Sequence, residues 1–145
     1  MKEISFGRYT SILYRYIQMI ISHRLSAYDM GSGQYLFLIT IAKHGGINQK
    51  DLTQQMNVDK ATTAKALAKL ESLTYIRRIK DENDRRYYSI YLTEKGKAFM
   101  PVLKKHLSEI SDILITDMTD EETALTKHVF DIMIRNAIDE VGKLK

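Results

Sequence analysis

The stretch from Ile47 to Thr93 constrains the fold of this chain more than any other part of the sequence. Asn48 and Asp59 each stand before a short amphipathic segment. At that place an Asn or Asp side chain can accept hydrogen bonds from the free amides of a helix's first turn. We therefore expect one helix that begins at Gln49 and a second, of about four turns, over 60–73.

The second of these helices follows a tight turn predicted at 55–58, and it has two different faces. Its inward positions are small or apolar: Thr63, Ala66, Leu67 and Leu70. Its outward positions are short near the start and cationic further on: Lys60, Ala61, Thr62, Ala64, Lys65 and Lys69. Short side chains let a helix approach base edges in the major groove of DNA, while lysines reach phosphates. This pattern is typical of a recognition helix.

Two strand-like segments follow at 75–80 and 87–92, both rich in β-branched and aromatic residues. The loop between them, 81–86, is too polar to bury and too long for a two-residue hairpin, so it should project into solvent. Arg85 and Arg86 at its end suit the narrow minor groove, where the negative potential of DNA is greatest. The two helices and this β wing together indicate a winged helix-turn-helix.

At these residues the chain resembles the MarR family, the multiple-antibiotic-resistance regulators. The wing signature of that family is Asp, any residue and Arg, then a strand that ends in Leu-Thr, with Gly three residues on. In this chain the signature falls on Asp84, Arg86, Leu92, Thr93 and Gly96. We expect Asp84 to pair with a neighbouring arginine or with a group of the recognition helix, and so to hold the wing tip in position. Thr74 departs from the family, which usually carries a helix-ending Gly there.

Apolar residues recur every three or four positions towards both ends of the chain. They predict a long helix over 6–28 and a shorter one over 34–43. A further helix should begin at Glu94, and Thr119 with Glu122 forms a capping box for the last one. The apolar face expected for the shorter helix is Leu36, Phe37, Ile39, Ile41 and Ala42. The terminal helices have more apolar surface than so small a domain can cover, which points to a partner subunit.

A chain of 145 residues is one domain by length. The predicted fold is mainly α with a small β wing, as a single MarR-like domain over 1–145. Within it, 34–93 forms the winged helix-turn-helix lobe, and 4–28 with 94–142 are the dimerisation helices. The resemblance implies that these N- and C-terminal helices form a dimerisation layer that joins two subunits.

The charge of the chain is unevenly distributed. Residues 1–46 hold 5 Lys and Arg against 2 Asp and Glu, 47–93 hold 9 against 6, and 94–145 hold 8 against 10. The first two segments each have a net charge of +3 and the last has −2, which together give the net charge of +4. Such asymmetry is expected if one end of the molecule meets phosphate, although many proteins that bind no nucleic acid are mildly basic.

Several function classes are excluded or disfavoured by what the sequence lacks. The absence of cysteine excludes disulfides and thiol-based sensing. No signal peptide and no membrane-length apolar run are present, so we expect a cytoplasmic protein without membrane contact. P-loop, dinucleotide-binding, nucleophile-elbow and HExxH motifs are also absent, and we expect neither an enzyme nor a cofactor.

The histidines are scattered and give no metal-binding spacing. They stand at His23, His44, His106 and His128, without an i, i+4 pair. We therefore predict no metal site, and a zinc-responsive regulator of the same fold is kept as an alternative.

Tyrosines are enriched in the first two predicted helices. The family binds small aromatic acids and phenols between its dimerisation helices and its DNA-binding lobe. That resemblance implies a candidate pocket lined by Tyr9, Arg15, Tyr16, Arg24 and Tyr35. Tyrosines at helical spacing are more often core or interface residues, so both interpretations stay open.

The sequence thus predicts a homodimeric, sequence-specific regulator that binds duplex DNA at a pseudo-palindromic operator. The expected role is that of a repressor released by a small effector, for which a phenol or an aromatic acid is the candidate class. A winged-helix module that binds protein or RNA is the alternative from another class. It is disfavoured because a protein-docking helix would expose apolar residues where this chain has Thr62, Ala64, Lys65 and Lys69.

Overall fold

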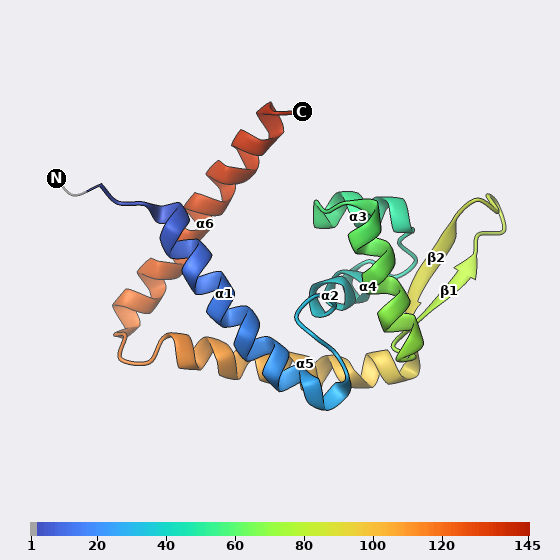
Figure 1. The fold of residues 1–145 in the computed structure, drawn as a ribbon, viewed down its shortest axis with the longest axis horizontal. Coiled ribbons are helices and arrows are strands. Elements are labelled where there is room, and N and C mark those ends of the chain that lie inside the picture. The colour runs from blue at the N-terminus through green and yellow to red at the C-terminus, as the bar shows by residue number, and fades with distance from the viewer. Residues whose placement is uncertain (1–2) are drawn as a thin grey trace. The chain divides into compact units, whose positions relative to one another are not determined.

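The computed structural model describes residues 3–145 and is mainly helical, with one two-stranded wing. Its elements are α1 (Phe6–Leu25), the short 3-10 helix η1 (Ser26–Tyr28), α2 (Tyr35–Lys43), α3 (Gln49–Met56), α4 (Lys60–Ser72), β1 (Ile76–Lys80), β2 (Tyr88–Leu92), α5 (Glu94–Leu114) and α6 (Asp120–Lys143) (Figure 1). The predicted fold class is confirmed. The chain divides into two compact units, one ending at Ile110 and the other beginning at Ser111.

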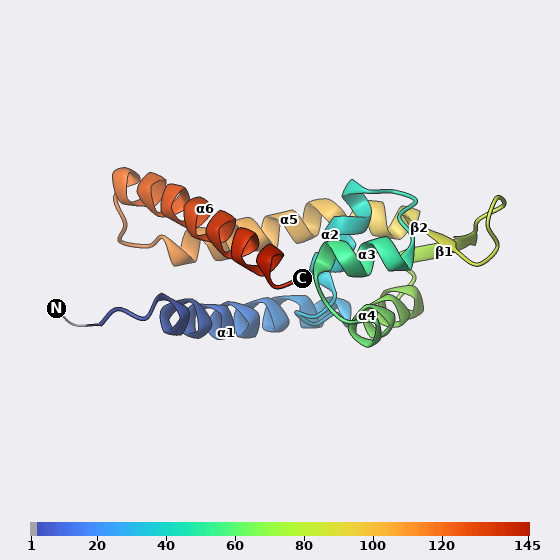
Figure 2. The same ribbon diagram turned by 90° about the horizontal axis from the view of Figure 1, so that it is seen from above.

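The first unit has one continuous apolar core, shared by the winged helix-turn-helix and the parts of α1 and α5 that belong to this unit. In the ribbon of Figure 2 the wing formed by β1 and β2 projects away from α2, α3 and α4. Its fully buried side chains include Leu25, Leu38, Ile41, Leu52, Leu67, Leu70, Ile90 and Leu103. The inward positions predicted for α4, Thr63, Ala66, Leu67 and Leu70, are all buried. This packing holds the outer face of α4 on a rigid support.

The wing is an antiparallel pair in which Ile76 lies opposite Leu92 and Lys80 lies opposite Tyr88. An isolated antiparallel bridge also pairs Ile47 with Ile90, the middle residue of β2. The Ile90 amide donates to the Ile47 carbonyl at 2.9 Å. The base of the wing is therefore joined by the backbone to the residues just before α3.

The predicted helix starts are confirmed. The Asn48 side chain accepts from the amide of Asp51 at 2.8 Å, and Asp59 accepts from the amide of Thr62 at 2.6 Å. The predicted turn at 55–58 is wrong in its first half, because α3 continues through Met56. Asn57 ends the helix in a left-handed conformation with φ 53°, which Asn adopts more easily than most residues.

Thr74 ends α4 with a positive φ of 62°, the geometry for which the family usually carries Gly. Its amide donates to the Glu71 carbonyl at 2.9 Å, and the Tyr75 amide donates to the Leu70 carbonyl at 3.0 Å. This pair of bonds is a Schellman motif. Both hydrogen bonds of the motif are therefore present although Thr74 is β-branched, and a β-branched residue is strained in the left-handed conformation.

The predicted apolar face of α2 is wrong in part. Tyr35, Phe37, Leu38 and Ile41 are the buried residues of this helix, whereas Leu36 and Ala42 are exposed. A short helix that is apolar nearly all round has no clear stripe, so its periodicity could not identify the inner side.

The second unit comprises the end of α5 and all of α6. Thr119 and Glu122 form the predicted capping box, with the Glu122 amide donating to the Thr119 hydroxyl at 3.1 Å. In α6, which is described along its whole length, no residue is buried. Leu125, Ile134 and Ile138 are among its exposed apolar side chains.

Candidate nucleic-acid interface

The recognition helix α4 is fixed at its start by its own cap. Asp59 accepts hydrogen bonds from Thr62, first of all from the backbone amide, and these hold the pKa of the Asp59 carboxyl below its usual range. On the inner side of α4, the Thr53 hydroxyl of α3 donates a hydrogen bond to the Thr63 hydroxyl at 2.9 Å. Thr63 is completely buried. These contacts fix the angle between the two helices without using the outer face of α4.

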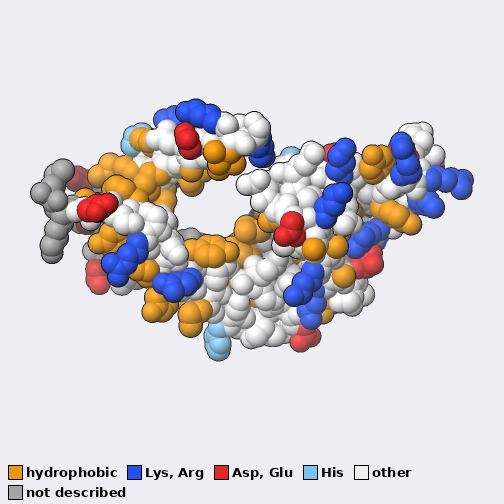
Figure 3. Space-filling model, turned by 45° about the horizontal axis from the view of Figure 1, so that its top comes forward, with side chains coloured by type: hydrophobic (Ala, Val, Ile, Leu, Met, Phe, Trp, Pro, Cys, Tyr) orange, Lys and Arg blue, Asp and Glu red, His pale blue; other side chains and the backbone are white. Residues whose placement is uncertain are grey.

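The outer face of α4 is free of acidic side chains over its first three turns. All of the predicted contact residues are exposed: Lys60, Ala61, Thr62, Ala64, Lys65 and Lys69. Within residues 3–145, none of the three lysines among them takes part in an ion pair. Figure 3 shows Lys and Arg side chains gathered over the winged-helix region and its wing. The face offers cations whose charge is not already neutralised.

A groove of about 410 Å³ lies where the starts of α3 and α4 face the end of the wing loop. Its lining carries two lysines and no carboxylate: Gln49, Lys50, Thr53, Gln54, Lys60 and Tyr87. Such a lining suits an oxyanion such as a backbone phosphate. Sequence reasoning missed Lys50 and Tyr87 as part of this surface, although the position of Lys50 in the first turn of a capped helix was a usable signal.

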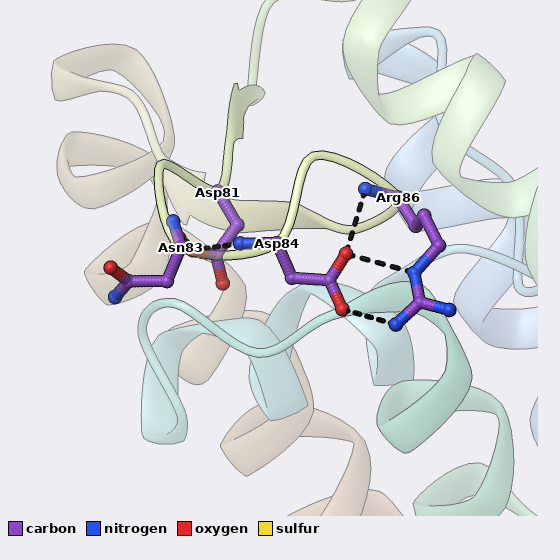
Figure 4. Close-up of polar contacts among 4 residues, drawn as sticks. All are labelled: Asp81, Asn83, Asp84 and Arg86. Carbon is purple, nitrogen blue, oxygen red and sulfur yellow. Dashed lines mark hydrogen bonds and ion pairs between the residues drawn. The ribbon is translucent and has the colours of Figure 1, made fainter.

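The wing loop is shaped by hydrogen bonds to its own backbone. The Asp81 carboxylate accepts from the amides of Asn83 at 2.8 Å and Asp84 at 3.3 Å (Figure 4). Asp and Asn side chains stabilise turns in this way. The loop therefore has a defined course up to Asp84.

Asp84 holds Arg86 by a forked pair of hydrogen bonds. The Arg86 Nε lies 2.9 Å from Asp84 Oδ1 and its Nη2 lies 2.8 Å from Oδ2, while the Arg86 amide also donates to Oδ1 at 3.1 Å (Figure 4). These bonds lower the pKa of Asp84 and raise that of Arg86. The Arg86 side chain is still 82% exposed. Neighbouring Arg85 is exposed as well.

The rest of the wing signature joins the strands to the helices on either side. The Thr93 hydroxyl donates to the Thr74 carbonyl at 2.6 Å and accepts from the Gly96 amide at 3.0 Å. A Cβ on Gly96 would lie 2.2 Å from the Tyr75 carbonyl oxygen, so a side chain there would collide with the backbone. The Thr and Gly positions are therefore structural, whereas the Arg86 side chain is exposed and Asp84 is partly buried.

The candidate ligand residues lie in different surroundings. Tyr9 and Tyr16 are 68% and 61% exposed, and Arg15 is exposed too. Tyr35 is buried, which raises the pKa of its phenol, with a smaller contribution from Tyr14. Arg24 forms an ion pair with Glu109 of α5. A pocket formed by these residues stays a prediction.

Residues 3–145 contain neither a candidate metal centre nor a candidate membrane-spanning helix. No group of three or more His, Cys, Asp or Glu side chains is placed to hold a metal ion. The histidines have other neighbours, such as Gln55 at 3.0 Å from His44 and Tyr28 at 3.4 Å from His106. No helix in this range combines the length and the apolar character that crossing a bilayer would need.

The fold and the cationic outer face of α4 define a winged-helix protein of the type that reads nucleic acid. The sequence model of the MarR family matches residues 32–88. A solved MarR transcriptional regulator from Methanosarcina mazei Go1 superimposes with a TM-score of 0.87 at 40% identity, over 92% of this chain and 96% of that one.

Two relatives extend this comparison. The chain is 34% identical to an uncharacterized HTH-type transcriptional regulator, YybA of Bacillus subtilis (strain 168), over 65% of this chain and 63% of that protein. It is 32% identical to the HTH-type transcriptional regulator SarZ of Staphylococcus aureus (strain MRSA252), over 83% and 71%. The match to YybA thus spans slightly less than two thirds of that relative. The chain belongs to the MarR family, whose members are transcription regulators and not enzymes.

Proposed function

We propose that this protein is a homodimeric transcriptional regulator that binds duplex DNA sequence-specifically, with α4 in the major groove and the wing in the adjacent minor groove. The observation that carries this proposal is the combination of two features in one compact unit. One is an outer face of α4 with short side chains and with lysines that form no ion pair among the described residues. The other is an exposed guanidinium at the end of the wing, braced by Asp84.

The side chains of α4 divide into two roles by length. Ala61, Thr62 and Ala64 are short enough to let the helix backbone approach base edges, and the Thr62 hydroxyl can donate or accept there. Lys65 and Lys69 lie further along the exposed face and reach outwards to phosphates. We therefore assign sequence preference to the first group and general affinity to the second.

In the wing, Arg86 is the proposed minor-groove contact. Its bidentate pairing with Asp84 fixes the side chain before DNA arrives, which reduces the entropy lost on binding. The guanidinium carries its charge at any physiological pH. Because most of the side chain is exposed while it is paired, it can meet DNA without breaking the pair. Arg85, which is also exposed, would contact the neighbouring phosphates of the DNA backbone.

The proposed assembly and regulation follow from family membership together with the exposed apolar residues of the terminal helices. Two copies joined through these helices would present two recognition helices to a pseudo-palindromic operator. We further propose that the protein works in the cytoplasm as a repressor released by a small phenol or aromatic acid. Tyr9, Arg15, Tyr16, Arg24 and Tyr35 are the candidate pocket residues once the partner subunit is present.

The direct test is an anisotropy titration of labelled operator and random duplexes at several salt concentrations. Lys65→Ala should weaken binding to both duplexes and flatten the salt dependence by about one unit, since one phosphate contact is lost. Thr62→Val should instead change the preference between duplexes. Lys104→Ala, which removes an exposed lysine of α5, is the matched control and should leave both unchanged. Equal loss on both duplexes for Thr62→Val would contradict the assignment.

A further inference from the structure

Arg78 lies within the winged-helix region, but it differs from the arginines of the wing tip. It stands in β1 two residues after the buried Ile76, so it shares the inward face of the strand. Its side chain is only 25% exposed, compared with 82% for Arg86. A half-buried arginine must have polar partners inside the protein, because burying its charge alone would be costly.

Those partners come from two different helices. The Arg78 Nη1 donates to the side-chain oxygen of Gln49 at 3.2 Å, and its Nε lies 3.3 Å from a carboxylate oxygen of Glu71. The second contact is an ion pair and not a hydrogen bond, since Arg78 Nε has no hydrogen-bond partner among the described residues. Gln49 is the first residue of α3, and Glu71 lies in the last turn of α4. One guanidinium therefore joins β1, the start of α3 and the end of α4.

Because of its position along β1, the contact made by Arg78 can control the orientation of the whole wing. Arg78 lies opposite Ile90, which is itself bridged to Ile47, so it marks the point where the base of the wing is fixed to the helices. Beyond Arg78 the strand pair continues through Lys80 and Tyr88 to the loop that carries Arg86. A small rotation at the base would produce a larger displacement of Arg86 at the tip.

We propose that Arg78 is a positioning residue for DNA recognition, which sets the wing at the angle to α4 that lets both grooves be reached together. The proposal rests on the function proposed above. The planar guanidinium suits this role because its donors point in fixed directions, whereas the three donors of a lysine ammonium rotate on a flexible stem and set no angle between partners. Gln49 also lines the groove between α3, α4 and the wing, so the clamp and that surface share a residue.

The competing interpretation is that Arg78 contacts phosphate and that Glu71 merely neutralises it in the free protein. The two interpretations differ in what they predict for the ratio of operator to random-duplex affinity. A phosphate contact acts on every sequence alike, so its loss lowers both affinities and the salt dependence. A positioning residue acts only where both grooves must fit, so its loss lowers the ratio and leaves the salt dependence unchanged.

The test measures operator and random-duplex affinities over a range of salt for four single variants. Arg78→Met keeps an unbranched apolar stem without the guanidinium and should lower operator affinity about tenfold, with little change for random DNA. Arg78→Lys keeps the charge and should lose most of the same preference. Glu71→Gln should also lower the ratio. Arg77→Met, on the opposite face of β1 and packed over Tyr91, is the matched control and should leave the ratio unchanged.

A double variant, Glu71→Gln with Arg78→Met, separates a shared clamp from two independent effects. If both residues act through one contact, the double variant should lose no more preference than Arg78→Met alone. Thermal melting and light scattering on each variant confirm that it is folded and dimeric. Wild-type preference in Arg78→Lys, or equal loss on both duplexes in Arg78→Met, would overturn the clamp alone. A wild-type protein without any operator preference would overturn the proposed function and the clamp together.

Discussion

The winged-helix region and the last helix both carry apolar stripes, but they bury them differently. In the winged helix, Leu52, Leu67 and Leu70 are completely shielded within one chain. In α6, Ile134 and Ile138 remain 54% and 64% exposed. The first region thus completes its core locally, whereas the second has apolar surface left over. The winged helix is thus stabilised within one chain, whereas α6 has the exposed apolar surface that the proposed dimer would bury.

The largest effect should come from placing charge on the uncovered surface of α6. Ile134→Glu with Ile138→Glu should weaken dimerisation by about 100-fold or more, because both charges would be buried at the interface. The winged helix should melt as before, since neither residue belongs to its core. Light scattering and operator titration measure the two effects. A double variant that remains dimeric at micromolar concentration would remove the distinction between the two regions.

The next effect concerns the rigid region and its wing. Arg86→Ala should cost about 1–3 kcal/mol of operator affinity, because the residue would lose its place in the concentrated negative potential of the minor groove. Folding and dimerisation should be nearly unchanged. Asp84→Ala should fall between Arg86→Ala and wild type, since it disorders the wing without removing the contact. Titrating both variants against one operator at fixed salt tests the order. Wild-type affinity for Arg86→Ala would mean that its exposed charge is merely solvated.

A smaller effect is expected at the end of the recognition helix. Thr74→Gly should raise the free energy of unfolding by about 1 kcal/mol, since it relieves a left-handed β-branched residue while keeping both backbone bonds of the turn. Ser72→Gly in the same turn has ordinary helical geometry and should instead lower stability by about 0.5 kcal/mol. Urea denaturation measures both. A loss of stability in Thr74→Gly would show that the threonine side chain stabilises this turn.

The smallest expected effect concerns the pKa of Asp84. Hydrogen bonds from Arg86 lower the pKa of Asp84, so their contribution to wing order is complete above the ordinary Asp value of about 3.9 and is lost as pH falls through the lowered pKa. In Arg86→Ala the pKa of Asp84 should return upwards toward its usual range. Carboxyl NMR on the two proteins measures the difference. An unchanged Asp84 pKa would show that the pair does not persist in solution.

These regions also differ in how well the sequence predicted them. The caps at Asn48, Asp59 and Thr119 were predictable because each depends on a side chain and an amide three residues away. The pairing of Asp84 with Arg86 was predictable for the same reason, since the partners are two residues apart.

Features that depend on distant parts of the chain were harder to predict. The inner side of α2 is chosen by packing, so Leu38 was missed and Leu36 was assigned wrongly. The role of Arg78 needs Gln49 and Glu71 to meet in space, although its place two residues after Ile76 already put a cation on the inner face of the strand. No residue of α6 is buried in the structure, so its apolar positions could indicate only that a partner covers them, without showing which residues do so.

The most direct test of the account is to select bound duplexes from a random DNA library with the purified protein and to sequence them. The account predicts one enriched pseudo-palindrome whose half-sites are about one helical turn apart, roughly 34 Å, as two recognition helices joined by the terminal helices require. Enrichment of a single unpaired half-site, or of no sequence at all, would contradict it.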